Sequence, residues 1–135
     1  ITDESHLDAT GDTAVGAITS GVYAPALDNP ANKKLVEEYE RAFGKTQRLN
    51  LVNAMIWDSL QVVYAGLEAQ RGAAFNPDKF VATLRGRKFD SPRGPFTLDK
   101  DNGDIIQNVY IRRVERRNGL LQNVTLETFR DVPTK

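Results

Sequence analysis

Few residues in this chain could carry out acid–base or nucleophilic chemistry. His6 is the only histidine, and the chain has no cysteine. A catalytic triad needs a histidine held between a nucleophile and a carboxylate, and His6 lies in a polar stretch beside Ser5 and Asp8 that gives no sign of one. We interpret His6 as a solvated loop residue, with a proton-sensitive or ligand contact as the alternative. We expect no enzymatic activity, no catalytic residue and no cofactor.

One acidic segment has the composition of a calcium-binding loop. Asp99, Asp101 and Asp104 lie close together around Gly103. A calcium loop of the EF-hand type has its glycine at the sixth position and a bidentate glutamate at the last. Here the glycine comes one position early, and Tyr110 stands where the glutamate should be. We therefore interpret the segment as a polar turn between strands and predict no metal site.

A dense basic run, from Arg112 to Arg117, could in isolation contact phosphate. Strand alternation would place its arginines on both faces of a sheet, and Glu115 within the run can pair with some of them. We interpret the run as a solvated hairpin edge. Eighteen Lys and Arg residues balance eighteen Asp and Glu residues, so no nucleic-acid partner is expected.

The first elements that could position these side chains are a strand and a helix. Residues 14–23 are apolar and β-branched, which is typical of a buried strand. Asn29 and Pro30 give a cap and a first-turn signal, and Gly44 gives a stop. These signals predict an amphipathic helix over residues 30–43.

Two more helices and a hairpin are expected after it. A broad apolar stripe predicts a helix from about residue 50 to 71, with surface suited to burial on two sides. A short helix should run from Asn76-Pro77 to Gly86. Strands over 105–115 and 120–129 flank an Asn-Gly pair, the strongest short-range hairpin signal.

This inventory is incomplete for a self-contained fold. At 135 residues, 40% hydrophobic and 27% charged, the chain has the size and composition of one soluble domain. However, the early strand has no parallel neighbour and the second helix carries too much apolar surface. The elements look like part of a larger α/β fold.

The segments taken together resemble the C-terminal part of the solute-binding proteins of branched-chain amino acid type ABC transporters, which have the type I periplasmic binding protein fold. The resemblance covers essentially the whole chain. It rests on these stretches: Thr2-Asp3-Glu4, Gly11-Asp12-Thr13-Ala14-Val15-Gly16, residues 30–39, and Phe89-Asp90-Ser91-Pro92-Arg93-Gly94-Pro95-Phe96 continued by residues 104–115. The last of these is the most specific.

The resemblance implies a two-lobed α/β fold with a C-terminal β-hairpin, in which ligand binds between lobes joined by three crossings. Residues 1–135 would then be a C-terminal fragment. Residues 1–23 would be a second-lobe remnant and crossing strand, 24–95 the helical part of the first lobe, and 96–135 the C-terminal strands. Ligand contacts to both lobes would select a closed form that a membrane permease recognises.

The same resemblance implies a set of ligand-binding residues. The segment of Asp3 and Glu4 would border the cleft, where a carboxylate suits a ligand ammonium, and Ser20 and Tyr23 would lie near a crossing. The Trp57-Asp58 pair could be a ligand platform or a core side chain beside a surface charge, and we favour core packing for Trp57. Relatives usually have a tyrosine at this position, which argues against a ligand role for the ring.

The resemblance and the lack of a catalytic constellation together predict an extracytoplasmic, periplasmic solute-binding component of an ABC importer. Its ligand would be an amino acid or a related small carboxylate, and its partner a membrane permease. The alternative is a ligand-sensing domain of the same fold in a receptor or regulator.

The isolated 135-residue chain should self-associate and bind no ligand tightly. Half a cleft lacks the opposing contacts, and apolar helix faces left uncovered form a large patch. Size-exclusion chromatography over a concentration series and calorimetry with amino acids test this. A monomer at high concentration, or micromolar binding, would contradict it.

Overall fold

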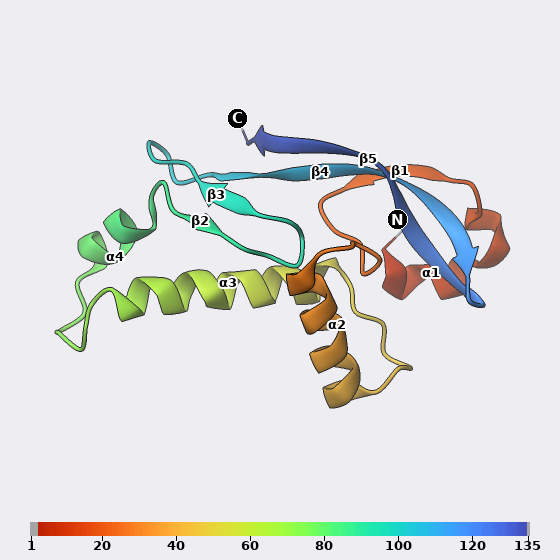
Figure 1. The fold of residues 1–135 in the computed structure, drawn as a ribbon, viewed down its shortest axis with the longest axis horizontal. Helices are drawn as coiled ribbons and strands as arrows, with labels where there is room; N and C mark the ends of the chain where they lie inside the picture. Colours follow the sequence, from red (N-terminus) through yellow and green to blue (C-terminus); the bar gives the residue numbers. More distant parts are fainter. Residues whose placement is uncertain (1–2, 135) are drawn as a thin grey trace.

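The computed structural model describes residues 3–134, so Thr2 of the first resemblance motif lies outside the described residues. The described residues form several helices and one five-stranded sheet (Figure 1). The elements are α1 (Glu4–Thr10), the 3-10 helix η1 (Gly11–Ala14), β1 (Ile18–Gly21), α2 (Pro30–Phe43), α3 (Leu51–Glu68), α4 (Pro77–Leu84), β2 (Lys88–Phe89), β3 (Phe96–Leu98), β4 (Ile105–Arg117) and β5 (Leu120–Pro133).

The sheet is built around β4. All its pairings are antiparallel: β1 and β3 pair with different parts of β4, β2 pairs with β3, and β5 pairs with β4 along most of its length. The turn between β4 and β5 is Asn118-Gly119, and both residues have positive φ, as a two-residue hairpin turn requires. The predicted hairpin is confirmed.

The helix predictions from capping signals are confirmed. Asn29 caps α2 by accepting a hydrogen bond from the Asn32 backbone N–H at 2.8 Å, and Gly44, at positive φ, ends that helix. Asn50 and Asn53 form a reciprocal capping box at the start of α3. Side-chain oxygens here satisfy backbone donors that would otherwise have no partner.

One face of β4 is buried and contributes residues to two separate apolar clusters, and a third cluster, which holds Leu84 of α4, packs against Ile105 at the start of β4. Tyr110 lies in the first cluster with residues of α2, α3 and the segments before them. Val114 lies in the second cluster with Leu7 of α1 and Leu121 of β5. In Figure 1, α1 accordingly lies toward one end of the long strands and α4 toward the other. We call the first cluster, with α2, α3 and the segments before them, the helical group. We call the second cluster, with α1 and the start of β5, the α1 group.

A buried ion pair fastens the turn between β2 and β3 onto α3. Asp58 Oδ2 accepts hydrogen bonds from Arg93 Nε at 2.7 Å and from Ser91 Oγ at 2.8 Å, and the two charged side chains are 4% and 7% exposed. The Tyr110 hydroxyl donates to the Arg93 carbonyl at 2.6 Å. The expectation that Asp58 is a surface charge is wrong, because Arg93 reaches it from a distant turn. Trp57 is half-buried and packs against the first cluster, as expected.

The first quarter of the chain differs from prediction. The strand predicted over 14–23 covers only Ile18–Gly21, and Ile18 is 60% exposed. The stretch around His6, interpreted as a loop, is helix α1. Asp3 caps this helix and Leu7 anchors it by burial. A single buried apolar residue in a seven-residue helix leaves no periodic pattern to read.

One face of α3 lacks a cover within residues 3–134. The exposed apolar side chains on this helix are Val52, Met55, Ile56, Leu60, Val63, Tyr64 and Leu67. The two-sided burial expected for this helix is therefore met on one side only by the described residues. No described helix combines the length and the apolar character needed to span a bilayer.

Replacing Arg93 by Met should lower the free energy of unfolding by about 3–5 kcal/mol, because it leaves the Asp58 carboxylate buried without its cation. Urea denaturation of the full-length protein measures the change. The matched control is Lys34→Met, which removes an exposed pair with Glu38 at 3.9 Å and should cost less than about 0.5 kcal/mol. Similar losses in both variants would contradict the prediction.

Candidate functional site

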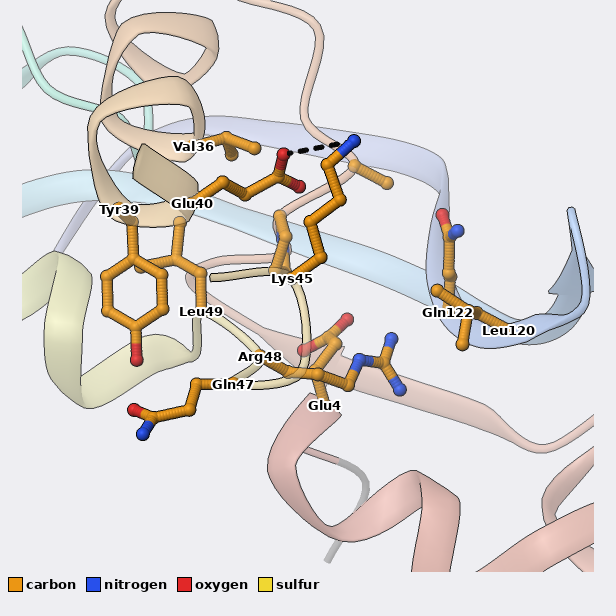
Figure 2. A pocket seen from close by; sticks show the side chains of 12 residues that line it. Glu4, Val36, Tyr39, Glu40, Lys45, Gln47, Arg48, Leu49, Leu120 and Gln122 are labelled. Atoms are coloured by element: carbon orange, nitrogen blue, oxygen red, sulfur yellow. Dashed lines mark ion pairs between the residues drawn. The ribbon is translucent and has the colours of Figure 1, made fainter. Parts of the chain in front are cut away.

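A groove of about 210 Å³ opens between the helical group and the α1 group. The loop between α2 and α3 contributes Arg48 and Leu49, α2 contributes Tyr39, and the opposite wall holds Glu4 and Gln122 (Figure 2). Its wall mixes apolar surface with polar and charged groups, as small-molecule sites do.

Glu4 begins α1 and is 2% exposed. Its Oε1 accepts hydrogen bonds from the Asn123 backbone N–H at 3.2 Å and from Asn123 Nδ2 at 3.0 Å. Burial raises the pKa of the Glu4 carboxyl, although the Asn123 hydrogen bonds oppose this shift. Glu4 therefore lines the groove and also ties α1 to β5, while its role in ligand binding stays a prediction.

Asp3 links the two groups directly. Its Oδ1 accepts from the Ser5 backbone N–H at 3.1 Å and the Ser5 hydroxyl at 2.7 Å, which caps α1. Its Oδ2 accepts from the Leu51 backbone N–H at the start of α3, at 3.2 Å. Both carboxylate oxygens thus have hydrogen-bond donors within the chain.

Ser20 and Tyr23 lie at the crossing between the groups and not on the wall of the groove. Ser20 is exposed on β1, opposite Ile111 of β4. Tyr23 is 1% exposed, and its hydroxyl donates to Asn32 Oδ1 at 2.8 Å. Burial raises the pKa of this phenol. Of the four predicted ligand-binding residues, Glu4 lines the groove, and the ligand roles of Asp3, Glu4, Ser20 and Tyr23 all stay predictions.

Arg112, interpreted as a solvated edge residue, is 8% exposed, so that interpretation is wrong. Its guanidinium donates to the carbonyls of Tyr23 and Ser20 and so fixes the chain that leaves β1. A Cβ at Gly21 would lie only 2.5–2.7 Å from this guanidinium, so a larger residue there would displace the guanidinium from its present position. Burial lowers the pKa of Arg112, and the nearby Glu4 and Asp3 charges oppose the shift.

The polar turn predicted around Gly103 is present. Asp99 Oδ1 accepts from the backbone N–H groups of Asp101 and Asn102 at 2.8 and 3.1 Å. Across residues 3–134, no three side chains of His, Cys, Asp or Glu gather in a way that could hold a metal ion.

Comparison with known proteins decides the family. The sequence profile described as "Periplasmic binding protein" matches residues 1–119. The chain belongs to the periplasmic binding protein family. A Leu/Ile/Val-binding protein homolog 6 of Brucella abortus (strain 2308) is 35% identical over 130 residues, which are 96% of this chain and 33% of the relative. The chain spans about a third of the length of such relatives.

Solved structures show the same family likeness. A solute-binding protein of an ABC transporter from Rhodopseudomonas palustris BisB5, in complex with 3,4-dihydroxybenzoic acid, is 35% identical with a TM-score of 0.88, and the match covers 96% of this chain and 35% of that one. One from R. palustris HaA2, in complex with p-hydroxybenzoic acid, is 32% identical with a TM-score of 0.91, covering 98% and 36%. This periplasmic binding protein segment therefore has the type I α/β fold that its sequence predicted.

The raised pKa of Glu4 predicts a pH-dependent stability. Between the ordinary value of 4.5 and the raised folded value, the folded state retains a proton that the unfolded chain has lost. The protonated Glu4 carboxyl therefore adds to the free energy of unfolding. This contribution is fully present below pH 4.5 and is lost as the pH rises through that window. Urea unfolding of the full-length protein from pH 4 to 7 should show a smaller fall in Glu4→Gln than in the wild type. Parallel pH profiles would refute this assignment.

Proposed function

We propose that the full-length protein is the periplasmic solute-binding component of an ABC importer, and that the groove beside Asp3 and Glu4 is part of its ligand cleft. The observation that carries the proposal is the position of the groove. It lies between two apolar clusters that pack separately and are crossed by the same strand, β4. Such an arrangement suits two lobes that close on a solute by bending at their connections.

The solute is a small aromatic carboxylate in preference to an amino acid. An amino acid needs an acceptor for its ammonium group, but both oxygens of Asp3 and one oxygen of Glu4 already accept hydrogen bonds from the chain. The groove wall also carries the apolar surface of Val36, Tyr39 and Leu120. An aromatic ring can bury that apolar surface.

The named relatives support both solute classes. Two structural relatives were solved with hydroxybenzoic acids, whereas the Brucella relative is named for leucine, isoleucine and valine. Because both carboxylate oxygens of Asp3 already accept hydrogen bonds from the chain, the aromatic acids are favoured. Delivery of the bound solute to a membrane permease would complete the function, with no chemical change to the solute.

Binding to the purified full-length protein tests this proposal. We expect 4-hydroxybenzoate and 3,4-dihydroxybenzoate to raise the unfolding temperature with a concentration dependence set by their Kd. Leucine should have a much smaller effect. The matched control is 4-hydroxybenzamide, which keeps the ring but has no carboxylate charge and should bind at least about tenfold more weakly.

Calorimetry on the same compounds gives the affinities directly. Tighter binding of leucine than of the benzoates would keep the transport role and overturn the aromatic assignment. If neither the benzoates nor the amino acids bind, the solute-binding proposal is wrong.

A further inference from the structure

Arg48 connects the two groups outside the strands that cross between them. Its neighbour in sequence, Leu49, is buried in the first apolar cluster. Its own guanidinium extends the other way: NH1 pairs with Asp8 Oδ1 on α1 at 2.9 Å, and NH2 donates to the carbonyl of Leu121 on β5 at 2.5 Å. Leu121 belongs to the second cluster. One side chain of the helical group is therefore bound at two points of the α1 group.

The Arg48 side chain is mostly buried, although its ionic partner is not. Arg48 is 15% exposed and Asp8 is 57% exposed, so solvent screens the ion pair from the Asp8 side, whereas the bond to the Leu121 carbonyl is partly buried. The planar Arg48 guanidinium bonds a carboxylate and a carbonyl on two different elements. Both bonds can form only when the α2–α3 loop lies against α1 and β5.

Exposed ion pairs within one group provide a contrast. Lys33 pairs with Asp28 at 2.6 Å, but these side chains are 71% and 85% exposed, and both belong to the helical group. A relative movement of the two groups would leave the Lys33 pair intact. The same movement would break both bonds of Arg48.

The ladder of β4 and β5 is irregular on both sides of Tyr110, and one of the two irregularities lies between the clusters. The pairing of β4 with β5 shifts register between Gln107 and Val109 and again between Ile111 and Arg112. Asp131, beside the first shift, has a positive φ of 52°. Bulges interrupt the regular ladder and bend a strand locally, and these two flank Tyr110, which lies in the first cluster.

We propose that Arg48 is a positioning residue that latches the closed arrangement of the two groups and so slows the release of solute. This inference rests on the proposed solute-binding function. A solute that contacts both groups selects the arrangement in which the Arg48 bonds form, so the free energy of these bonds adds to the apparent affinity. Arg48 also lines the groove, so the Asp8 variant described below, which changes the latch at a residue outside the groove wall, separates latching from direct contact with the solute.

The test is the kinetics of 4-hydroxybenzoate binding to the full-length protein. Arg48→Met should raise the dissociation rate, and with it Kd, by about 5- to 20-fold, while the association rate stays within about twofold. Small-angle scattering should show that the loaded variant is less compact than the loaded wild type. Arg48→Lys, which keeps the charge without the planar fork, should recover part of the loss.

Two further variants keep the proposal falsifiable if Arg48→Met folds poorly. Asp8→Asn removes the ion pair but leaves the Leu121 bond, so it should raise the dissociation rate by a smaller factor. Lys33→Met, the matched control, should leave binding unchanged. The unfolding temperature of the solute-free protein should change by less than about 2 °C in Asp8→Asn and Lys33→Met.

The experiment distinguishes a failure of the latch proposal from a failure of the proposed solute-binding function. If the wild type binds 4-hydroxybenzoate and the Arg48 and Asp8 variants release it at the same rate, the latch is wrong and the solute-binding function stands. An Arg48→Met variant that loses thermal stability but keeps its Kd would show a merely structural contact, and it also overturns the latch. A wild type that binds none of the compounds tested above overturns both proposals.

Discussion

A buried cation between two apolar clusters is the constraint on which this structure depends. Strand β4 carries Tyr110 into one cluster and Val114 into the other, and Arg112 lies between them on the same buried face. A charge in that position is tolerated only when hydrogen bonds replace its hydration. The carbonyls of Tyr23 and Ser20 supply two of those bonds, whereas the buried Nε of Arg112 has no hydrogen-bond partner among the described residues. The course of the chain after β1 thus meets part of what the buried Arg112 requires.

The same polar layer explains why the clusters stay distinct. Glu4 and Asn123 are both buried and hydrogen-bonded to each other next to Arg112, where apolar side chains would otherwise merge the two clusters. Polar groups that must keep specific partners define a boundary more sharply than apolar packing does. The groove at this boundary is thus lined partly by groups already engaged within the chain, which limits the chemistry left for a solute.

Much of the fold could be predicted because its signals are local. The Asn-Pro caps of α2 and α4, the terminating Gly44 and the Asn118-Gly119 turn act within a few residues of their own position, and each prediction made from them is confirmed. Helix α1 was missed because its stability comes from Leu7 packing against a strand more than a hundred residues later. Of the candidate site, Asp3 and Glu4 were named from a resemblance, whereas Arg48 and the buried role of Arg112 were not found.

The sequence by itself determined that α2, α3 and α4 are helical, where the long hairpin turns, the resemblance to a solute-binding family and the absence of thiol chemistry. Only the tertiary structure decided which charges are buried and what they bond. Asp58 meets Arg93, and Arg48 meets Asp8, across 35 and 40 residues of chain. The physical reason is that capping and turn preferences are set by neighbouring backbone, whereas the partner of a buried charge is whatever side chain or carbonyl the packed fold brings within hydrogen-bonding distance.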